Sequence, residues 1–401
     1  MTKRMSRAAM SQSGTSAAAD ATEARVAWDR VIRRRSFLKA GVGAGVASAV
    51  LPASGLLMST AHAASDKLPR GDVAILRFLA AAELIESDLW SQYAELGGAN
   101  GGNPAYIAAL QNLDGDMPQY ISDNTDDELS HAAFLNAYLK SKGEAQVNLD
   151  EFRKLPSSKA TGARQIGRLT NLLRLDVDTS WYTRYRGSGN PDFGTVFPQA
   201  LTIKNQPAIP LNDTDTPPNT PVPQPPLPSG NAKVQRIQAI ANTAGFHFAF
   251  IEQGGSSLYS TLALKVTNLE VLRIVISIGG VEVDHFSLWH DKVGNAVAQP
   301  LAGVTDPETG LHFPDFNDST KFPSEEFQTN LILPEPAEFL RDGFPAVSII
   351  RPTSTEKAGA VAAIQGFTDD LLFAGQSQEF FETAMELARA ADAAQRGSIR
   401  G

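Results

Sequence analysis

The sequence predicts an all-α fold built on four amphipathic helices, with an insert after the second helix and an extension after the fourth. Four segments place apolar residues at the 3-4-3-4 spacing of a helix with one buried face. The 24 prolines and 32 glycines of the 401-residue chain imply long irregular stretches, and prolines cluster between the second and third segments. A chain of this length can bury a large core and form two or three domains.

The four predicted helices fall into two pairs, which occupy residues 70–146 and 232–295. Pro118 suits the first turn of the second helix, where its missing N–H costs nothing. The predicted ranges are 71–96 and 118–142 in the first pair, and 232–265 and 268–293 in the second.

The rest of the chain beyond residue 70 is expected to be largely irregular. The insert, 147–231, ends in PLNDTDTPPNTPVPQPPLPSG, whose prolines favour an extended, solvated linker, and a short helix is expected within 158–186. The C-terminal extension, 296–401, is expected to be Pro-rich and irregular over 300–355. One further helix over 359–393 and a mobile polar tail complete the prediction.

Residues 1–63 have the order of parts found in an export signal. The basic run RRRSFLK at 33–39 precedes a weakly apolar run at 40–60, and Ala61-His62-Ala63 supplies small residues at the two positions that a signal peptidase reads. This order resembles a twin-arginine signal, which implies a periplasmic or extracellular protein. An uncleaved membrane anchor is the alternative, because about 20 residues can span a bilayer. Interruption by Pro52 and the scarcity of Leu and Ile favour cleavage, and hence no stable membrane span afterwards.

The charge and cysteine content exclude several classes of partner and site. Residues 1–63 hold nine Lys/Arg and three Asp/Glu, so the remainder has 26 basic and 41 acidic residues and a net charge of −15. Such an acidic surface argues against nucleic acid or anionic lipid as a partner. The chain has no cysteine, which excludes disulfides, thiolate metal sites, iron–sulfur clusters and Cys nucleophiles.

Each of the four apolar stripes carries at least one glutamate near its middle. The stripes are Leu76, Leu79, Glu83, Glu86, Trp90 and Tyr93; Ile121, Asn124, Glu128, His131, Leu135 and Tyr138; Gly245, Phe248, Glu252, Gly255, Tyr259 and Leu262; and Val275, Ile278, Glu282, His285 and Trp289. A buried ionised carboxylate costs several kcal/mol unless it is paired or bound to a cation. Four such groups on converging faces would also repel one another. Two divalent metals would balance four carboxylates, and oxygen and imidazole ligands without sulfur suit iron or manganese.

The order of residue types along the chain is Glu, Glu-x-x-His, Glu, Glu-x-x-His. This order resembles the ferritin-like superfamily of di-metal carboxylate four-helix bundles. The segments ELIESDLW, DELSHAAFL, FIEQGGSSLY and VEVDHFSLW are similar to the ferritin-like family that includes desiccation-related proteins. The resemblance covers roughly residues 70–146 and 232–295, and neither the insert nor the last hundred residues.

The resemblance implies a four-helix bundle holding two divalent metal ions, iron or manganese. Glu128 and Glu282 would bridge the two ions. Glu86 shares a stripe with Glu83, but Glu83 matches Glu252 in the internal repeat while the counterpart of Glu86 is Gly255, so Glu83 is preferred. The implied ligands are Glu83, Glu128, His131, Glu252, Glu282 and His285.

Several residues near these positions have a simpler interpretation. Thr125-x-x-Glu128 fits a capping box, unless the helix begins as early as Pro118. The histidines at 247, 290 and 312 match no ligand position. The aromatic residues of the stripes are interpreted as core-packing residues in preference to redox relays. The glycine pairs at 254–255 and 279–280 allow either close helix approach or room for a small ligand, and both alternatives stay open.

Three functions remain to be weighed. The first is redox chemistry on a small molecule such as oxygen or peroxide, or metal handling, at a di-iron or di-manganese centre; whether the protein is an enzyme stays open. The second is a non-catalytic desiccation or stress protein with a structural or vestigial metal site. Iron storage ranks below both. Storage shells need compact subunits, whereas the insert and the extension add well over a hundred residues to this one. A homo-oligomer of unknown size is compatible with each.

Overall fold

The structure is a computed structural model that describes residues 67–184, 198–216, 231–318, 320–321, 334, 343–348 and 355–398. The predicted export signal at 1–63 lies outside these ranges, and so does most of the Pro-rich end of the insert. The described part is mostly helical, in agreement with the predicted all-α class. Within it, no helix is both long and apolar enough to cross a bilayer.

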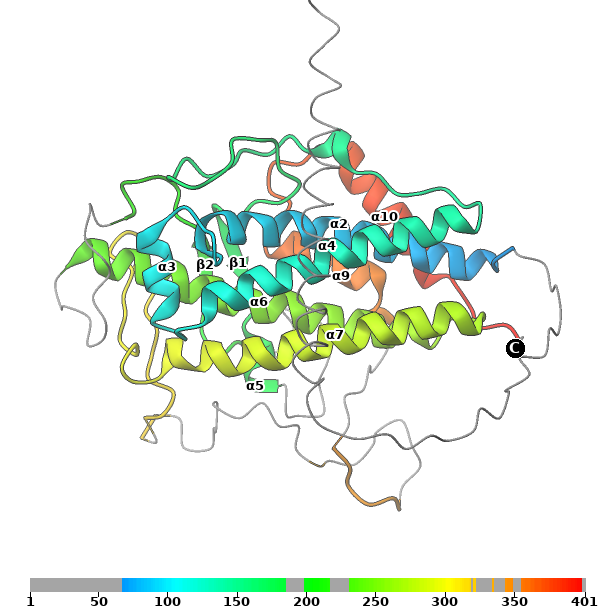
Figure 1. Cartoon of the computed structure of the whole chain (residues 1–401). Coiled ribbons are helices and arrows are strands. Elements are labelled where there is room, and N and C mark those ends of the chain that lie inside the picture. Colours follow the sequence, from blue (N-terminus) through cyan, green and yellow to red (C-terminus); the bar gives the residue numbers. More distant parts are fainter. Residues whose placement is uncertain are drawn as a thin grey trace, which may run out of the picture. The chain divides into compact units, whose positions relative to one another are not determined.

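The four predicted helices form with ends within a few residues of those expected. They are α2 (Arg70–Gly97), α4 (Met117–Ser141), α6 (Ala232–Ala263) and α7 (Leu269–Val293). Helix α2 packs along α4, and α6 packs along α7 (Figure 1). Rings at the centre join the two pairs: Trp90 of α2 lies 4.9 Å from Phe248 of α6 and 5.4 Å from Trp289 of α7, centroid to centroid.

Polar side chains fix where the helices begin. The Asn231 side chain accepts a hydrogen bond from Val234 N, and the Asn268 side chain accepts from the first backbone N–H groups of α7. Asp72, in the first turn of α2, accepts the N–H groups of Thr267 and Asn268 and so ties α2 to the α6–α7 turn. These caps satisfy donors that the start of a helix leaves without partners.

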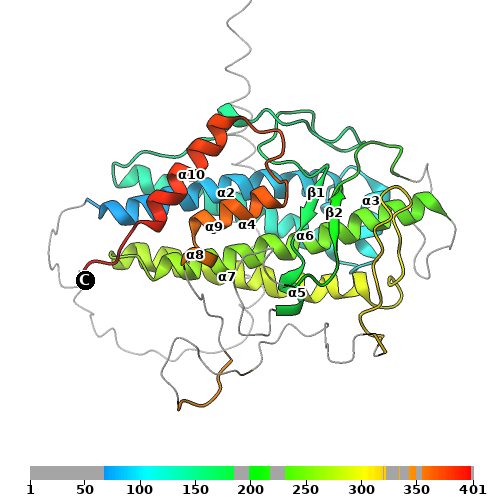
Figure 2. The same ribbon diagram turned by 180° about the vertical axis from the view of Figure 1, so that it is seen from behind.

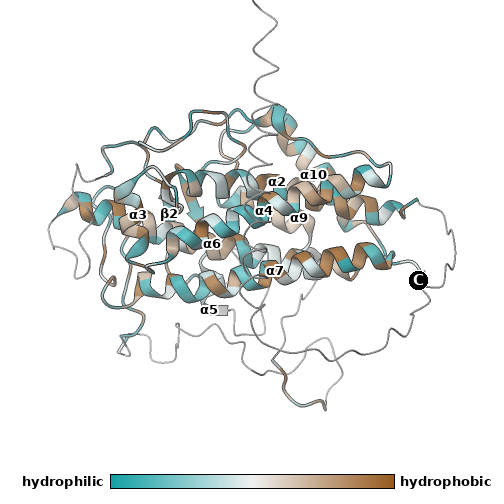
Figure 3. Cartoon of the chain, viewed as in Figure 1, coloured by the Kyte–Doolittle hydropathy of each residue, from teal (hydrophilic) through white to brown (hydrophobic). Residues whose placement is uncertain are grey.

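Helix α6 is buried around its whole circumference over residues 236–259, whereas α4 and α7 each keep an exposed face that carries hydrophilic residues (Figure 3). Ten of the fifteen residues in its segment AIANTAGFHFAFIEQ are apolar or glycine and the polar ones are buried as well, so this helix needs cover on every side. That cover comes from α7, from the short helix α3 (Pro104–Gln111), from the insert and from the C-terminal helices (Figure 2). The insert and the extension are therefore part of the core.

The described part of the insert is folded onto the helices. It contains the turn η1 (Asp150–Phe152), the short helix α5 (Ser180–Arg184) and an antiparallel pair of strands, β1 (Leu175–Val177) and β2 (Ile203–Gln206). The strands, like α3, were not predicted, because elements of three to eight residues are too short to show a period. The predicted short helix within 158–186 is present as α5.

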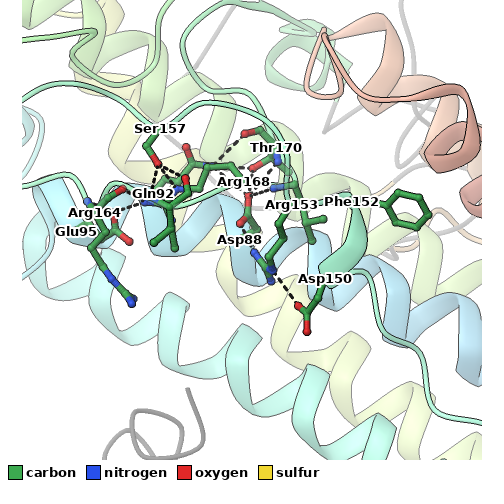
Figure 4. A network of polar contacts seen from close by, with 12 residues as sticks. Asp88, Gln92, Glu95, Asp150, Phe152, Arg153, Ser157, Arg164, Arg168 and Thr170 are labelled. Carbon is green, nitrogen blue, oxygen red and sulfur yellow. Dashed lines mark hydrogen bonds and ion pairs between the residues drawn. The ribbon is translucent and has the colours of Figure 1, made fainter. Parts of the chain in front are cut away.

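A network of buried polar groups holds the insert against α2 (Figure 4). Asp88 of α2 accepts hydrogen bonds from the backbone N–H groups of Leu169 and Thr170, and Arg153 Nη1 lies 2.6 Å from Asp88 Oδ1. Two turns further along α2, Arg168 Nη2 lies 2.5 Å from Glu95 Oε2. Carboxylates on the outer face of α2 thus meet the polar backbone of an otherwise irregular segment.

The C-terminal extension departs from the prediction of one helix over 359–393. It forms α8 (Thr355–Ala358), α9 (Ala360–Asp369) and α10 (Gln378–Asp392). The break occurs where Leu371 and Gly375 take positive φ values of 63° and 97°, which end a helix and turn the chain. Beyond α10, Arg396 Nε donates to Val266 O and Gly397 N donates to Thr267 Oγ1, so the start of the tail that was predicted to be mobile contacts the α6–α7 turn.

Candidate metal centre

The six candidate ligands lie together at the middle of the four long helices, and all six are buried. They form two groups, each with ligand atoms within 4.8 Å of one another, and Glu128 and Glu282 belong to both. The first group is Glu83, Glu128, His131 and Glu282; the second is Glu128, Glu252, Glu282 and His285.

Glu128 lies between the two imidazole rings. Its Oε2 is 3.3 Å from His131 Nδ1, and its Oε1 is 3.1 Å from His285 Nδ1. In the first group His131 Nδ1 is also 3.4 Å from Glu83 Oε2, and in the second His285 Nδ1 is 3.2 Å from Glu252 Oε2. Ligands about 2.0–2.2 Å from one ion lie about 3 Å apart at right angles, so these separations suit a metal in each group.

The start of α4 decides the interpretation of Glu128. Because the helix begins at Met117, Glu128 lies three turns into it and cannot form a capping box at its end. The Thr125 hydroxyl instead donates to Ile121 O at 2.6 Å, as hydroxyls inside helices often do. The carboxylate of Glu128 is therefore free to face His131, one helical turn further on.

Glu86, the alternative to Glu83, is buried but belongs to neither group. Burial raises the pKa of Glu86 well above its usual range, and the nearby carboxylates of Glu83, Glu128 and Glu252 raise it further. These effects favour the uncharged form of Glu86 beside the centre.

Two of the four glycines in the two glycine pairs, Gly255 and Gly279, are in close contact with side chains of the facing helix. A Cβ at Gly255 would collide with the carboxylate of Glu282, 2.9 Å from its Cδ, so this glycine makes room for a candidate ligand. A Cβ at Gly279 would lie 2.8 Å from Tyr259 Cβ, so this glycine permits the close approach of α6 and α7. Gly280 faces open space.

Burial and the neighbouring carboxylates have opposite effects on the pKa values of the two histidines of the centre. Burial alone would lower the pKa of His131, but the charge of Glu83 and the hydrogen bond to Glu128 raise it to about 10. Burial alone would likewise lower the pKa of His285, but the charge of Glu252 and the hydrogen bond to Asp127 raise it well above its usual range. Without a metal, both shifts favour the imidazolium forms of His131 and His285.

The pKa values of the glutamates depend on the same two effects, burial and the neighbouring charged groups. Burial raises the pKa of Glu83 to about 7 against the opposing effect of His131. Burial also raises the pKa of Glu252 and Glu282, and the neighbouring carboxylates add to the effect at Glu282. Burial would raise the pKa of Glu128 too, but hydrogen bonds from His131 and His285 outweigh it and hold the pKa well below its usual range. The centre thus holds protons that a divalent cation would displace.

Three side chains that sequence reasoning gave no role contact the candidate ligands. Asn124 Nδ2 donates to Glu128 and Glu252, the Tyr259 hydroxyl donates to Glu83 Oε1, and His285 Nε2 lies 3.1 Å from Asp127 Oδ2. Asn124 occupied a position on the apolar stripe, one turn before Glu128, and its polarity there was the available signal. Tyr259 was interpreted as core packing, since a tyrosine seven residues after a glutamate has no distinctive pattern.

The remaining histidines lie outside both groups, as predicted. His247 is fully buried and shares a hydrogen bond of 2.7 Å with the Tyr93 hydroxyl, and burial lowers its pKa to about 3, so it is neutral. His290 packs against the rings of Trp181 and Tyr182. His312 Nδ1 shares a hydrogen bond with the Thr305 hydroxyl on an exposed turn.

The donor set fits two divalent metal ions. Glu83 Oε2 and Glu282 Oε1 are buried without a hydrogen bond among the described residues, and their nearest ring nitrogen, His131 Nδ1, is 3.4 and 3.5 Å away. Buried carboxylate oxygens rarely lack a partner unless a cation supplies one. Four carboxylates and two imidazoles, without sulfur, match the preferences of iron and manganese.

Comparison of the chain with protein-family models, with curated proteins and with solved structures finds no match. The function therefore has to be argued from the centre itself.

Proposed function

We propose that this chain is an exported ferritin-like protein that binds a di-iron or di-manganese centre and uses it for redox chemistry on oxygen or peroxide, or for metal handling. The observation that carries the proposal is the pair of overlapping ligand groups that share Glu128 and Glu282. In this proposal α2 with α4 and α6 with α7 are the two halves of a ferritin-like four-helix bundle. Along the sequence, the insert lies between the two halves and the extension follows the second half.

Each candidate ligand has a role in this centre. Glu83 and His131 would serve one ion, Glu252 and His285 would serve the other, and Glu128 and Glu282 would bridge them. Two adjacent metals of this kind supply two one-electron changes and a template for a small molecule. The distance of Glu128 from both imidazoles supports its bridging role.

The burial of the centre supports a small substrate. The side chains of the bridging glutamates are 1% exposed, whereas those of His131 and His285 are 10% and 8% exposed. Among the six described ligands, the two imidazoles of α4 and α7 are thus the most exposed, and this narrow access suits a molecule the size of oxygen or peroxide. Asp127, whose side chain is 52% exposed, contacts His285 there and links the centre to bulk water for proton exchange.

The alternative is a non-catalytic desiccation or stress protein with a structural or vestigial metal site. One observation favours it: His131 and His285 together contact all four of the glutamates Glu83, Glu128, Glu252 and Glu282. Two imidazolium ions offset part of the buried negative charge, so the fold has a way to tolerate the centre without metal.

Elemental analysis of the protein, purified from its native compartment without added metal, tests the proposal. The comparison is an E128A/E282A double variant, which lacks both bridging carboxylates. We expect about two iron or manganese atoms per chain in the wild type and loss of both in the variant. A metal-free wild type that is equally well folded would sink the proposal and leave the stress-protein alternative.

The proposed export has its own test. Cleavage after Ala63 predicts a mature chain that begins at Ala64. Mass spectrometry of the periplasmic or extracellular protein should find that N-terminus, and replacement of Arg34 and Arg35 by Lys should retain the chain inside the cell. Recovery of a membrane-bound chain that keeps residues 1–63 would favour the anchor.

A further inference from the structure

The side chain of Asn124 contacts two of the six candidate ligands. Its Nδ2 donates to Glu128 Oε1 at 2.9 Å and to Glu252 Oε1 at 3.0 Å. Asn124 is 3% exposed and both carboxylates are fully buried. One amide thus holds one oxygen of each of two carboxylates that come from different helices, α4 and α6.

Trp289 sets the orientation of this amide. Its Nε1 lies 2.6 Å from Asn124 Oδ1, and an indole N–H can only donate, so the atom that faces it is the amide oxygen. The amide nitrogen must then face the carboxylates. Trp289 is itself fully buried and stacked on Trp90, which leaves the indole no other direction. An N–H donor fixed in this way restrains both carboxylates at the positions from which they face His285 Nδ1.

The other half of the centre is supported differently, because there the Tyr259 hydroxyl donates to Glu83 Oε1 and no amide occupies the matching position. Helix α7 repeats the Glu-x-x-His of α4, so the counterpart of Asn124, four residues before Glu282, is Ile278. By the same repeat the counterpart of Trp289 on α4 is Leu135. Neither side chain has a donor. The amide support is therefore confined to the half that contains Glu252 and His285.

We propose that Asn124, oriented by Trp289, is a positioning residue that holds Glu128 and Glu252 in place for the ion served by His285. That ion then binds more tightly than the ion served by His131. The inference rests on the proposed function, since it requires metal at the centre. Its basis is preorganisation, because hydrogen-bonding partners of metal ligands typically contribute about 10- to 100-fold to metal affinity.

Stepwise titration of the metal-free full chain with Mn²⁺ tests the proposal. Calorimetry gives the two dissociation constants, and low-temperature EPR separates one bound ion from a coupled pair. In N124L we expect the first Kd to rise about 10-fold and the gap between the two constants to narrow. W289F, which removes the indole N–H and replaces none of the six candidate ligands, should act in the same direction and keeps the test usable if N124L fails to fold.

W90F is the matched control. It makes the same truncation in the same ring cluster, but Trp90 Nε1 has no hydrogen-bond partner among the described residues, so both constants should stay at the wild-type values. Equal effects of W289F and W90F, or an unchanged first Kd in folded N124L, would overturn the role of Asn124 and leave the centre standing. A wild-type chain that takes up neither Mn²⁺ nor, without oxygen, Fe²⁺ would overturn the proposed function and this inference with it.

Discussion

Gly255 of α6 lies directly against the carboxylate of Glu282 on α7. No side chain could occupy position 255 without displacing that carboxylate, since an added Cβ would lie 2.9 Å from Glu282 Cδ and closer still to Oε2. A glycine inside a helix destabilises it by about 0.5–1 kcal/mol relative to alanine. The cost is offset here by the space that the glycine leaves for a candidate bridging ligand.

G255A should therefore lower the metal content while leaving the helix intact. The added methyl group moves Glu282 away from both ligand groups, so we expect fewer than two ions per chain. G280A is the control, because Gly280 faces open space in the same region of α7. It should keep the full metal content and gain about 0.5–1 kcal/mol in unfolding free energy. Elemental analysis and denaturant titration measure both quantities, and full occupancy in G255A would contradict the assignment of Glu282.

Glu83 and Glu86 should respond differently to the loss of charge. Burial favours the uncharged form of Glu86, so E86Q, which puts an uncharged group of the same shape in its place, should disturb the centre little. We expect E86Q to bind both ions, whereas E83Q should lose the ion served by His131. Metal analysis of the two variants, side by side, decides which glutamate ligates. Loss of metal in E86Q with retention in E83Q would exchange their roles.

The long helices could be predicted because each is 25 residues or longer and carries an apolar stripe throughout. Shorter elements could not, since α3 has eight residues and the strands have three and four. The break between α9 and α10 depends on the positive φ of Leu371. This conformation is uncommon for leucine, so the sequence does not indicate it. The burial of α6 on every side follows from its mostly apolar composition. The composition does not indicate which segments cover it.

The six candidate ligands could be named in advance because two Glu-x-x-His pairs stand at one-turn spacing, and because the order of residue types resembles the ferritin-like superfamily, which implies the whole set. Their supporting contacts could not. Asn124 reaches Glu252 across 128 positions, and Tyr259 reaches Glu83 across 176, so only the packing of the helices brings them together. A polar residue on an apolar stripe, as at Asn124, indicates that a partner exists without saying which.

Asp88 should be essential for docking of the insert on α2. Its side chain is 1% exposed and accepts from Arg153 and from two backbone N–H groups, so D88A leaves buried donors without a partner. We expect a loss of about 3 kcal/mol in unfolding free energy and faster proteolysis within the insert. Asp150 also pairs with Arg153 but is 73% exposed, so D150A should change stability by less than about 1 kcal/mol. Similar losses in the two variants would contradict the docking role.

The stability of the metal-free protein should fall as pH rises from about 5 to 9. The pKa of His131 is about 10 in the folded chain against 6.5, and that of Glu83 about 7 against 4.5, so the folded form binds both protons more tightly. The stabilisation is complete below the unfolded values and is lost as pH passes the folded ones. Thermal melting of chelator-treated protein should therefore show a higher Tm at pH 6 than at pH 8.

Metal should reverse this dependence. Mn²⁺ requires deprotonated glutamates and neutral imidazoles, so its binding releases the protons held by Glu83 and His131 and strengthens as pH rises. The rise in Tm on adding Mn²⁺ should consequently be larger at pH 8 than at pH 6, as mass action on the folded state requires. An H131A/H285A variant is the control, since it cannot exchange imidazolium protons for metal, and its Tm should be insensitive to Mn²⁺ at both values. Equal shifts at pH 6 and pH 8 in the wild type would mean that Mn²⁺ binds elsewhere on the chain.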